Sequence, residues 1–259
     1  MMLTRLIYPL SVRERLSWRL RKLLTEASEK NVSLCFNDSV QLDLSHKDVG
    51  HQSIILNGFV ELDLTKRIKN LAKRGGLFVD VGANYGYFSC LWAAEKPDNK
   101  SIAFEASPLN SPAIQNNIIK NKLDNQIKLE SVALGREVGT LQFTLENGEG
   151  QTGWGGFTLE RSSTAVDVSV NTLDNYARAN GIREIDVLKI DVEGADTWVL
   201  LGARNLIEQK RIKHVFFEIN PARMRLLDIA HDEAEKFLLE RGYVVKKMSG
   251  QEYYAYVSK

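Results

Sequence analysis

Short apolar runs alternate with amphipathic segments along most of this chain of 259 residues. The runs at 77–81, 101–105, 127–134, 185–190 and 214–219 are rich in β-branched and aromatic residues, which is typical of strands buried on both faces of a parallel sheet. Most of the segments between them have the apolar spacing of helices. This order predicts an α/β fold with a doubly wound, Rossmann-like sheet and helices on both of its faces.

Local signals predict where several helices begin and end. Ser107 and Pro108 suit the cap and the first position of a helix that runs to about Lys122. Gly242 suits the end of another helix. Helices are expected over residues 85–95, between Gly194 and Ile207, and over 231–241. The chain should close with antiparallel strands over 244–248 and 253–257, joined at Ser249-Gly250.

Residues 135–184 interrupt this alternation. Alternating apolar residues predict strands near 141–145 and 166–170, and Thr172 should cap a short helix through Ala179. Between the two strands, five glycines fall within residues 147–156, which disfavours a helix or a central strand. We therefore expect a hairpin arm whose tip bears Trp154. The tip is either a surface loop or a substrate-binding element, and the flat indole suits stacking on a sugar ring.

Residues 1–64 are expected to form an extension before a Rossmann-like domain at 65–259. Residues 32–36 and 40–44 alternate as a hairpin, the segment up to 64 suggests further short strands with a turn at Asn57-Gly58, and a helix should cover 64–72. Residues 12–24 have helical apolar spacing. We favour a helix that packs on the core. The alternative is a basic helix in peripheral contact with an anionic membrane through Arg5, Arg13, Arg15, Arg19, Arg21 and Lys22.

Composition excludes some classes of protein. The 34 basic and 33 acidic residues give a net charge of +1, which does not favour a nucleic-acid partner. The two cysteines, Cys35 and Cys90, have no metal or redox spacing. No run is long enough for a transmembrane helix, and no signal peptide is evident. We expect a cytoplasmic protein, with the N-terminal helix as the one candidate for contact with the inner membrane surface, and the sequence indicates no oligomeric state.

A glycine loop follows the first core strand, in the pattern Asp80-x-Gly82-x-x-x-Gly86. It lacks the middle glycine of the dinucleotide fingerprint, and Asp80 would repel a pyrophosphate. A cationic nucleotide such as S-adenosylmethionine (SAM) fits better. Glu105 ends the next strand 23 residues after Gly82, near the spacing at which an acid binds ribose hydroxyls. An ordinary strand–turn–helix without a ligand is the competing interpretation.

Further acids follow later strands. Asp191 and Glu193 leave the fourth core strand, and Glu218 ends the fifth, so all three should lie at one edge of the sheet. They could bind the ammonium of a cofactor, orient an acceptor hydroxyl, accept its proton, or hold Mg²⁺. We favour the metal-free roles, and we expect Lys189 to neutralise a neighbouring carboxylate. The absence of histidine from this group disfavours zinc or iron.

The same residues resemble the FkbM-like family of class I SAM-dependent methyltransferases. The resemblance covers residues 58–220 in the family's usual order. Ala106, where proline is common, and Asp196, where glutamate is common, depart from the pattern. The matching segments are Gly58-x-x-Glu61, Phe78-Val79-Asp80-Val81-Gly82-Ala83-Asn84-x-Gly86, Ala103-Phe104-Glu105, Val132-Ala133-Leu134-Gly135, Thr172-Leu173-Asp174 and 188–195.

The resemblance implies a seven-stranded sheet whose last strand is antiparallel, and O-methylation of a sugar, polysaccharide or natural product. It implies SAM contacts from the glycine loop, the ribose acid and the third and fourth strand ends, with Glu61 beside the substrate. The implied cofactor-binding residues are Asp80, Gly82, Ala83, Asn84, Gly86, Glu105, Ala106, Val132, Ala133 and Asp191. A magnesium-dependent sugar O-methyltransferase and a non-catalytic nucleotide-binding module are the alternatives.

Overall fold

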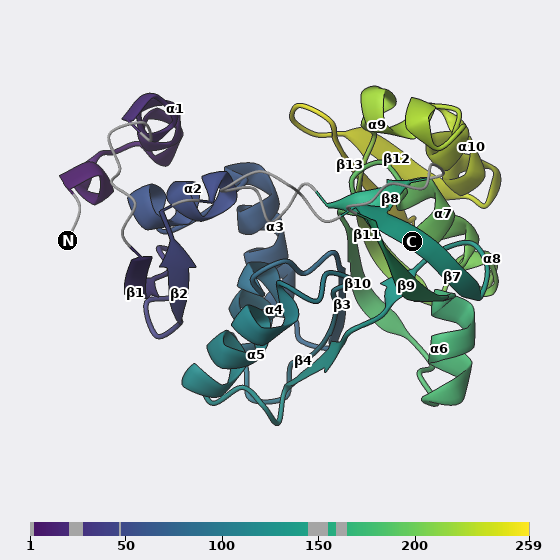
Figure 1. The fold of residues 1–259 in the computed structure, drawn as a ribbon, viewed down its shortest axis with the longest axis horizontal. Coiled ribbons are helices and arrows are strands. Elements are labelled where there is room, and N and C mark those ends of the chain that lie inside the picture. The colour runs from purple at the N-terminus through teal and green to yellow at the C-terminus, as the bar shows by residue number, and fades with distance from the viewer. Residues whose placement is uncertain (1–2, 21–27, 47, 145–154, 159–164, 259) are drawn as a thin grey trace.

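The computed structural model describes residues 3–20, 28–46, 48–144, 155–158 and 165–258. Its centre is a seven-stranded sheet in which β13 alone, within the described residues, runs antiparallel to the others, as expected for the class of fold (Figure 1). Across the sheet the strands are β12 (Tyr243–Lys247), β13 (Glu252–Val257), β11 (Ile212–Glu218), β10 (Ile185–Ile190), β3 (Leu77–Val81), β4 (Lys100–Phe104) and β5 (Ile127–Glu130).

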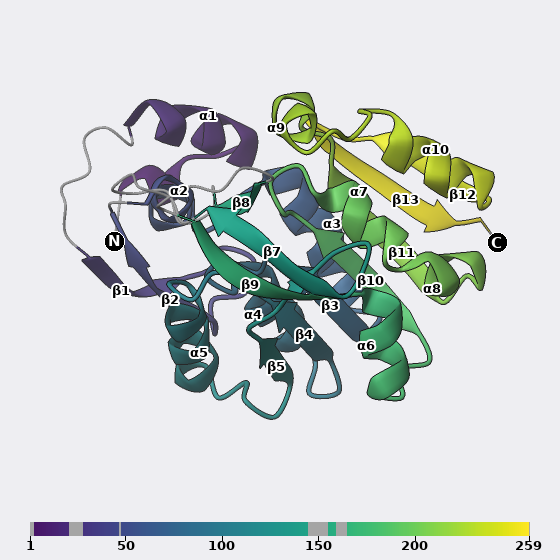
Figure 2. The same cartoon turned by 45° about the vertical axis from the view of Figure 1, so that its right-hand side comes forward.

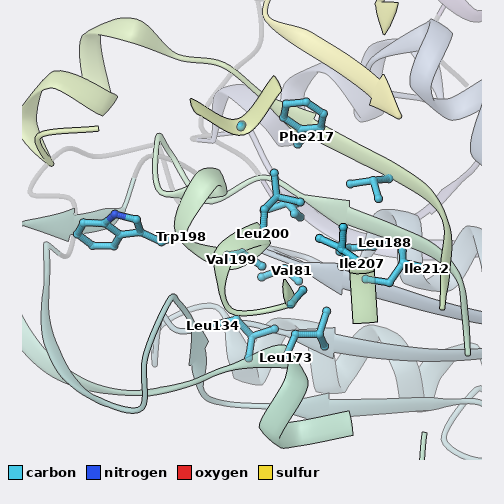
Figure 3. Packing of buried hydrophobic residues seen from close by; sticks show 14 of the residues in the cluster. Val81, Leu134, Leu173, Leu188, Trp198, Val199, Leu200, Ile207, Ile212 and Phe217 are labelled. Atoms are coloured by element: carbon cyan, nitrogen blue, oxygen red, sulfur yellow. The ribbon is translucent and has the colours of Figure 1, made fainter. Parts of the chain in front are cut away.

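Helices cover both faces of this sheet, because successive strand residues point to opposite sides. Phe78 packs with one set of helices, whereas its neighbours Val79 and Val81 pack with the other. Figure 3 shows Val81 within this second cluster. The first set comprises α3 (Leu62–Ala72), α4 (Tyr87–Ala93) and α5 (Ser111–Lys120). The second comprises α6 (Leu173–Ala179), α7 (Asp196–Leu201), α8 (Arg204–Glu208), α9 (Pro221–Leu226) and α10 (Glu233–Glu240).

Two helices differ from the sequence-based prediction. Ser107 does not cap α5, because its amide donates to Glu105 Oε1 at 2.8 Å and residues 107–110 form a turn. The helix starts at Ser111 instead. The expected single helix up to Ile207 is broken into α7 and α8 around Gly202. At Gly202 the backbone packs so closely that a Cβ would lie 2.0 Å from the Gly135 carbonyl oxygen.

The insertion is a second sheet and not a simple hairpin. The predicted strand at 127–134 divides, so that β5 joins the main sheet and β6 (Ala133–Leu134) joins the second. In Figure 2 β7 and β9 cross in front of the main sheet. The short strand β8 was missed because its glycines suggest a loop, yet Phe157 packs edge-on against Phe143. The other strands are β7 (Gly139–Thr144), β8 (Gly156–Thr158) and β9 (Ala165–Asn171), and Trp154 lies outside the described residues.

The N-terminal extension contains the predicted hairpin, formed by β1 (Ser28–Ser33) and β2 (Gln41–Ser45). It also contains α2 (Val49–Asn57), where short strands were expected. The caps explain the helix: Asp48 accepts from the His51 amide at 3.0 Å, and Gly58, with φ 79°, ends it in the left-handed conformation. The first elements are η1 (Leu3–Leu6) and α1 (Leu10–Leu20).

Two arginines of this extension point inward. Arg13 is 2% exposed, and its guanidinium donates to the carbonyl oxygens of Ile7, Asn57 and Arg5. Arg5 donates to the carbonyl oxygens of Ser33, Ile54 and Ile55. These contacts tie η1 and α1 to α2 and support the packing interpretation of the helix. Within the described residues, no helix has the length and apolar character needed to span a membrane.

Candidate active site

A main cavity of about 350 Å³ opens at the carboxyl ends of the parallel strands β3, β4, β10 and β11. Ligands bind at this edge in open α/β sheets. The strand ends, the insertion and the N-terminal extension all contribute to its wall. Most predicted site residues line it: Glu61, Gly82, Asn84, Glu105, Ala106, Val132, Ala133, Asp191, Glu193 and Glu218.

The glycine loop after β3 is held tightly against two neighbouring strands. The amides of Gly82 and Ala83 both donate to the Phe104 carbonyl oxygen at 3.0 Å. A Cβ on Gly82 would lie 1.9 Å from the Asp191 carbonyl oxygen, so only glycine fits this backbone. Gly86, with φ 81°, starts α4. Ala83 and Gly86 do not line the cavity, and they act by shaping the loop that does.

Glu105 lies at the wall of the cavity with its carboxylate fixed in place. Oε2 accepts from the Asn84 amide at 2.7 Å, and Oε1 accepts from the Ser107 amide at 2.8 Å. The side chain is buried, which raises the pKa of this carboxyl to about 7 although the amide hydrogen bonds act in the opposite direction. A fixed carboxyl with remaining lone pairs can accept from the two hydroxyls of a ribose.

Asp80 lies behind the cavity wall and does not line the cavity, so the prediction that it contacts the cofactor directly is wrong. Its Oδ2 accepts from Ser89 Oγ at 2.8 Å, and its Oδ1 is 3.6 Å from Lys189 Nζ. Burial raises the pKa of Asp80, and Lys189 opposes this. Lys189 is also 3.3 Å from Asp191 Oδ2, so it neutralises neighbouring carboxylates as predicted. Burial alone would lower the pKa of Lys189, but Asp191 and Asp80 raise it above its ordinary value.

Four carboxyl groups face the part of the cavity beyond the glycine loop. Burial, followed by repulsion from Asp191, raises the pKa of Glu61 to about 8 and that of Glu218 to about 9. Glu193 has φ 52° and lies 3.7 Å from Arg223 Nε. Burial and mutual repulsion therefore favour the protonated forms of Glu61 and Glu218 in the ligand-free protein, and a bound cation would favour loss of the proton.

Several lining residues were not predicted from the sequence. They are Asp48, Val49, Gly50 and Ser53 from the start of α2, Tyr85 from the glycine loop, and Phe143 and Phe157 from the second sheet, whereas Gly155 belongs to the arm that was proposed to bind the acceptor. Helix α2 itself was missed, so its contribution could not be expected. Tyr85 stands between two glycines and carries no sequence signal for its direction. Within the described residues, no three His, Cys, Asp or Glu side chains converge on a point where a metal ion could be held.

The sheet order, the glycine loop after β3, the acid after β4 and the acids after β10 together define a class I methyltransferase fold and site. The chain belongs to the FkbM methyltransferase domain family, whose domain matches residues 80–245.

Three curated proteins are similar to the chain. The 31-O-demethyl-FK506 methyltransferase FkbM of Streptomyces tacrolimicus is 25% identical over 199 residues, 66% of this chain and 74% of that protein. Methyltransferase sdnD of Sordaria araneosa is 29% identical over 48% of this chain and 59% of its own length. The 2-O-methyltransferase NoeI of Sinorhizobium fredii is 23% identical over 54% and 63%. The chain thus spans less than two-thirds of the length of sdnD and of NoeI.

Proposed function

We propose that this protein transfers a methyl group from SAM to a hydroxyl oxygen of a sugar or another hydroxyl-bearing natural product, without a metal ion. The observation that carries the proposal is that Glu105 and three further acids, Glu61, Asp191 and Glu218, line the same cavity. Two of the relatives named above are O-methyltransferases by name. A non-catalytic nucleotide-binding module would not need several acids in the part of the cavity that lies past the nucleotide.

The residues present fit SAM. A cavity of about 350 Å³ lies in the range of roughly 300–1,000 Å³ that holds drug-sized ligands. Glu105 suits the ribose hydroxyls, Phe104 and Val132 offer apolar surface for a base, and the acids suit the two positive charges of SAM. Bound SAM supplies an electrophilic methyl carbon on a sulfonium sulfur.

The chain's own residues would orient the acceptor and remove its proton. The cavity acids and Glu105 would hold SAM, which would give its methyl carbon to the acceptor oxygen and leave as SAH, with the carbon–sulfur bonding pair kept by sulfur. The hydroxyl proton would pass to a carboxylate, for which we propose Glu218, because it ends β11 at the cavity wall and its pKa is raised by burial and by Asp191. Orientation supplies much of the remaining rate enhancement. We keep the insertion arm, with Trp154, as a further proposed contact for the acceptor.

Calorimetric titration with S-adenosylhomocysteine (SAH) tests the proposal. We expect SAH to bind and NAD not to bind. Glu105→Gln should weaken the binding of SAH by about 10–100-fold, because a hydrogen bond to a charged group contributes about 1.5–3 kcal/mol. The matched control is Glu137→Gln, whose side chain is 78% exposed. Binding of NAD but not of SAH would reject the methyltransferase proposal. Submillimolar binding of Mg²⁺ to the SAH complex would favour the magnesium-dependent alternative.

A further inference from the structure

A second groove, of about 810 Å³, lies between α6 and the start of α8, two helices that pack side by side on one face of the main sheet (Figure 2). None of the described residues lines both this groove and the active-site cavity. Its volume is in the range of about 300–1,000 Å³ that holds a small ligand. Five arginines line the groove, and they are Arg136, Arg178, Arg183, Arg204 and Arg211.

The lining of this arginine groove is strongly basic, although the chain as a whole has 34 basic and 33 acidic residues. Asp174 is the only acid among the described residues that line it. The carboxylate of Asp174 already accepts from the backbone amides of Asn205 at 2.8 Å and of Leu206 at 3.0 Å. The lining therefore concentrates positive charge that its own carboxylate does not balance.

Neutral partners hold two of these arginines in place. Arg211 donates to the carbonyl oxygens of Ile182 and Arg183, and Arg178 donates to Asn175 Oδ1 at 2.7 Å. Within the described residues, neither Arg178 nor Arg183 nor Arg211 forms an ion pair with a carboxylate. Such contacts orient a guanidinium without neutralising it, and the planar fork then suits two oxygens of a phosphate.

The other two arginines have only weak ion pairs. Arg136 lies over the ring of Trp198, with Cζ 4.8 Å from the ring centroid, and its Nε is 3.6 Å from Glu137, which is 78% exposed. Arg204 is 3.7 Å from Glu208, which is 46% exposed. Because exposed pairs at these distances contribute little, both guanidiniums retain the capacity to bind an anion.

Apolar side chains form the rest of the wall. Val138, Ala177, Ile182, Leu201 and Leu206 line the groove beside the arginines. Val138 is 64% exposed, so a ligand with an apolar ring would remove this side chain from water. The net charge of +1 does not favour an extended polyanion, whose attraction depends on a larger basic surface. A compact, multiply charged anion with a ring attached suits the lining better.

We propose that the arginine groove is a second ligand site, which binds a diphosphate group joined to an organic ring, as in a nucleoside diphosphate. The arginines bind the phosphate oxygens, and the apolar wall covers the ring. Among the described residues, no Lys, Arg or His lines the active-site cavity and several acids do, so that cavity would repel the same ligand. The inference goes beyond the proposed function and does not depend on it.

Titration calorimetry of the full chain with UDP, UMP, uridine and inorganic diphosphate tests the proposal. We expect UDP to bind at least about tenfold more tightly than UMP, a difference of about 1.4 kcal/mol, and more weakly as NaCl rises from about 50 to about 300 mM. Undetectable binding of UDP, or equal affinities for UDP, UMP and uridine, overturns the inference. Inorganic diphosphate that binds as tightly as UDP would overturn the role of the ring and assign the groove to the free ion.

Two double variants locate the site. Arg178→Gln with Arg183→Gln should weaken UDP at least about tenfold, because two unpaired guanidiniums are lost. Arg74→Gln with Arg225→Gln removes the same charge from exposed positions outside the groove, and it should leave the affinity for UDP unchanged. All four positions are exposed, so both variants should keep the thermal midpoint of the parent protein. Equal weakening by the two double variants overturns the inference.

Competition with SAH separates this inference from the proposed function. UDP and SAH should bind together, and the Arg178→Gln and Arg183→Gln double variant should bind SAH as the parent protein does, because neither residue lines the active-site cavity. Displacement of UDP by SAH would place UDP in the active-site cavity and overturn the inference. Absence of SAH binding with UDP still bound would count against the proposed function alone.

Discussion

Glu218 ends β11 with its carboxyl facing other acids, and within the described residues it forms no ion pair with a Lys or an Arg. Its pKa of about 9 follows from burial first, then from Asp191 and Asp196. Asp196 is fully buried and accepts from the Glu218 amide at 2.9 Å, which fixes the backbone at the strand end. The carboxyl therefore occupies a defined position. Its raised pKa favours the protonated form until a positively charged ligand binds beside it.

Glu218→Gln should lower kcat by about 10²–10⁴-fold, the usual contribution of a general base. In the parent protein kcat/KM should rise from pH 7 towards pH 9, because the carboxyl accepts a proton only above its own pKa of about 9. The variant should lack this rise. Transfer of a radiolabelled methyl group measures both effects, with Glu137→Gln as the control. Parent-like rates and the same pH profile in Glu218→Gln would exclude Glu218 as the base.

At the residue scale, sequence spacing predicted which acids line the cavity better than it predicted which way individual side chains point. The distance from Gly82 to Glu105 predicted an acid at the cavity wall, and the structure has it there. The same reasoning assigned Asp80 to the ligand, but strand orientation turns Asp80 towards Ser89 and Lys189. Tyr85 was missed because its direction depends on the left-handed conformation of Asn84, which has φ 51°.

At the scale of elements, the apolar runs predicted all strands of the main sheet, because the central strands β3, β4 and β10 are largely buried on both faces and turns bound each strand. Helix α2 was missed because Ile54-Ile55-Leu56 is compatible with a strand or a helix, and only the caps at Asp48 and Gly58 decide. The second sheet was incompletely predicted because β6 and β8 are only 2 and 3 residues long. Strands this short depend on tertiary pairing.

The inward direction of Arg13 leads to a prediction for α1. Arg13→Met should reduce the free energy of unfolding by about 2–4 kcal/mol, because buried carbonyl oxygens lose a charged donor. Arg15→Met, at an exposed position of the same helix, should change it by less than about 0.5 kcal/mol. Chemical denaturation of both variants measures the difference. Equal stability of the two would contradict the packing interpretation of α1.

At the scale of the whole molecule, the crowded acids tie stability to pH. Glu61, Glu105, Glu218, Glu252 and Asp196 all have pKa values raised to between about 7 and 9 by burial. The folded protein therefore binds more protons than the unfolded chain above the ordinary pKa of an acid. Stability from these groups is complete at low pH and is lost as the pH rises through their folded pKa values.

The thermal midpoint of the ligand-free protein should consequently fall between pH 6.5 and pH 9. Burial lowers the pKa of His51 and His214, which costs stability only below about pH 6.5, the ordinary pKa of histidine. The window above it reports on the acids alone. Glu61→Gln combined with Glu218→Gln should flatten the slope in scanning fluorimetry. An unchanged slope in the double variant would show that these two acids are not the source.

The wall of the active site is contributed by two parts of the chain, one inside the matched family domain and one before it. The family domain covers 80–245 and includes the glycine loop, Glu105 and the strand-end acids. Glu61 and the start of α2 come from before it. We therefore expect that exchange of this leading segment between relatives would alter the preference for the acceptor, while the residues of the family domain would still bind the methyl donor.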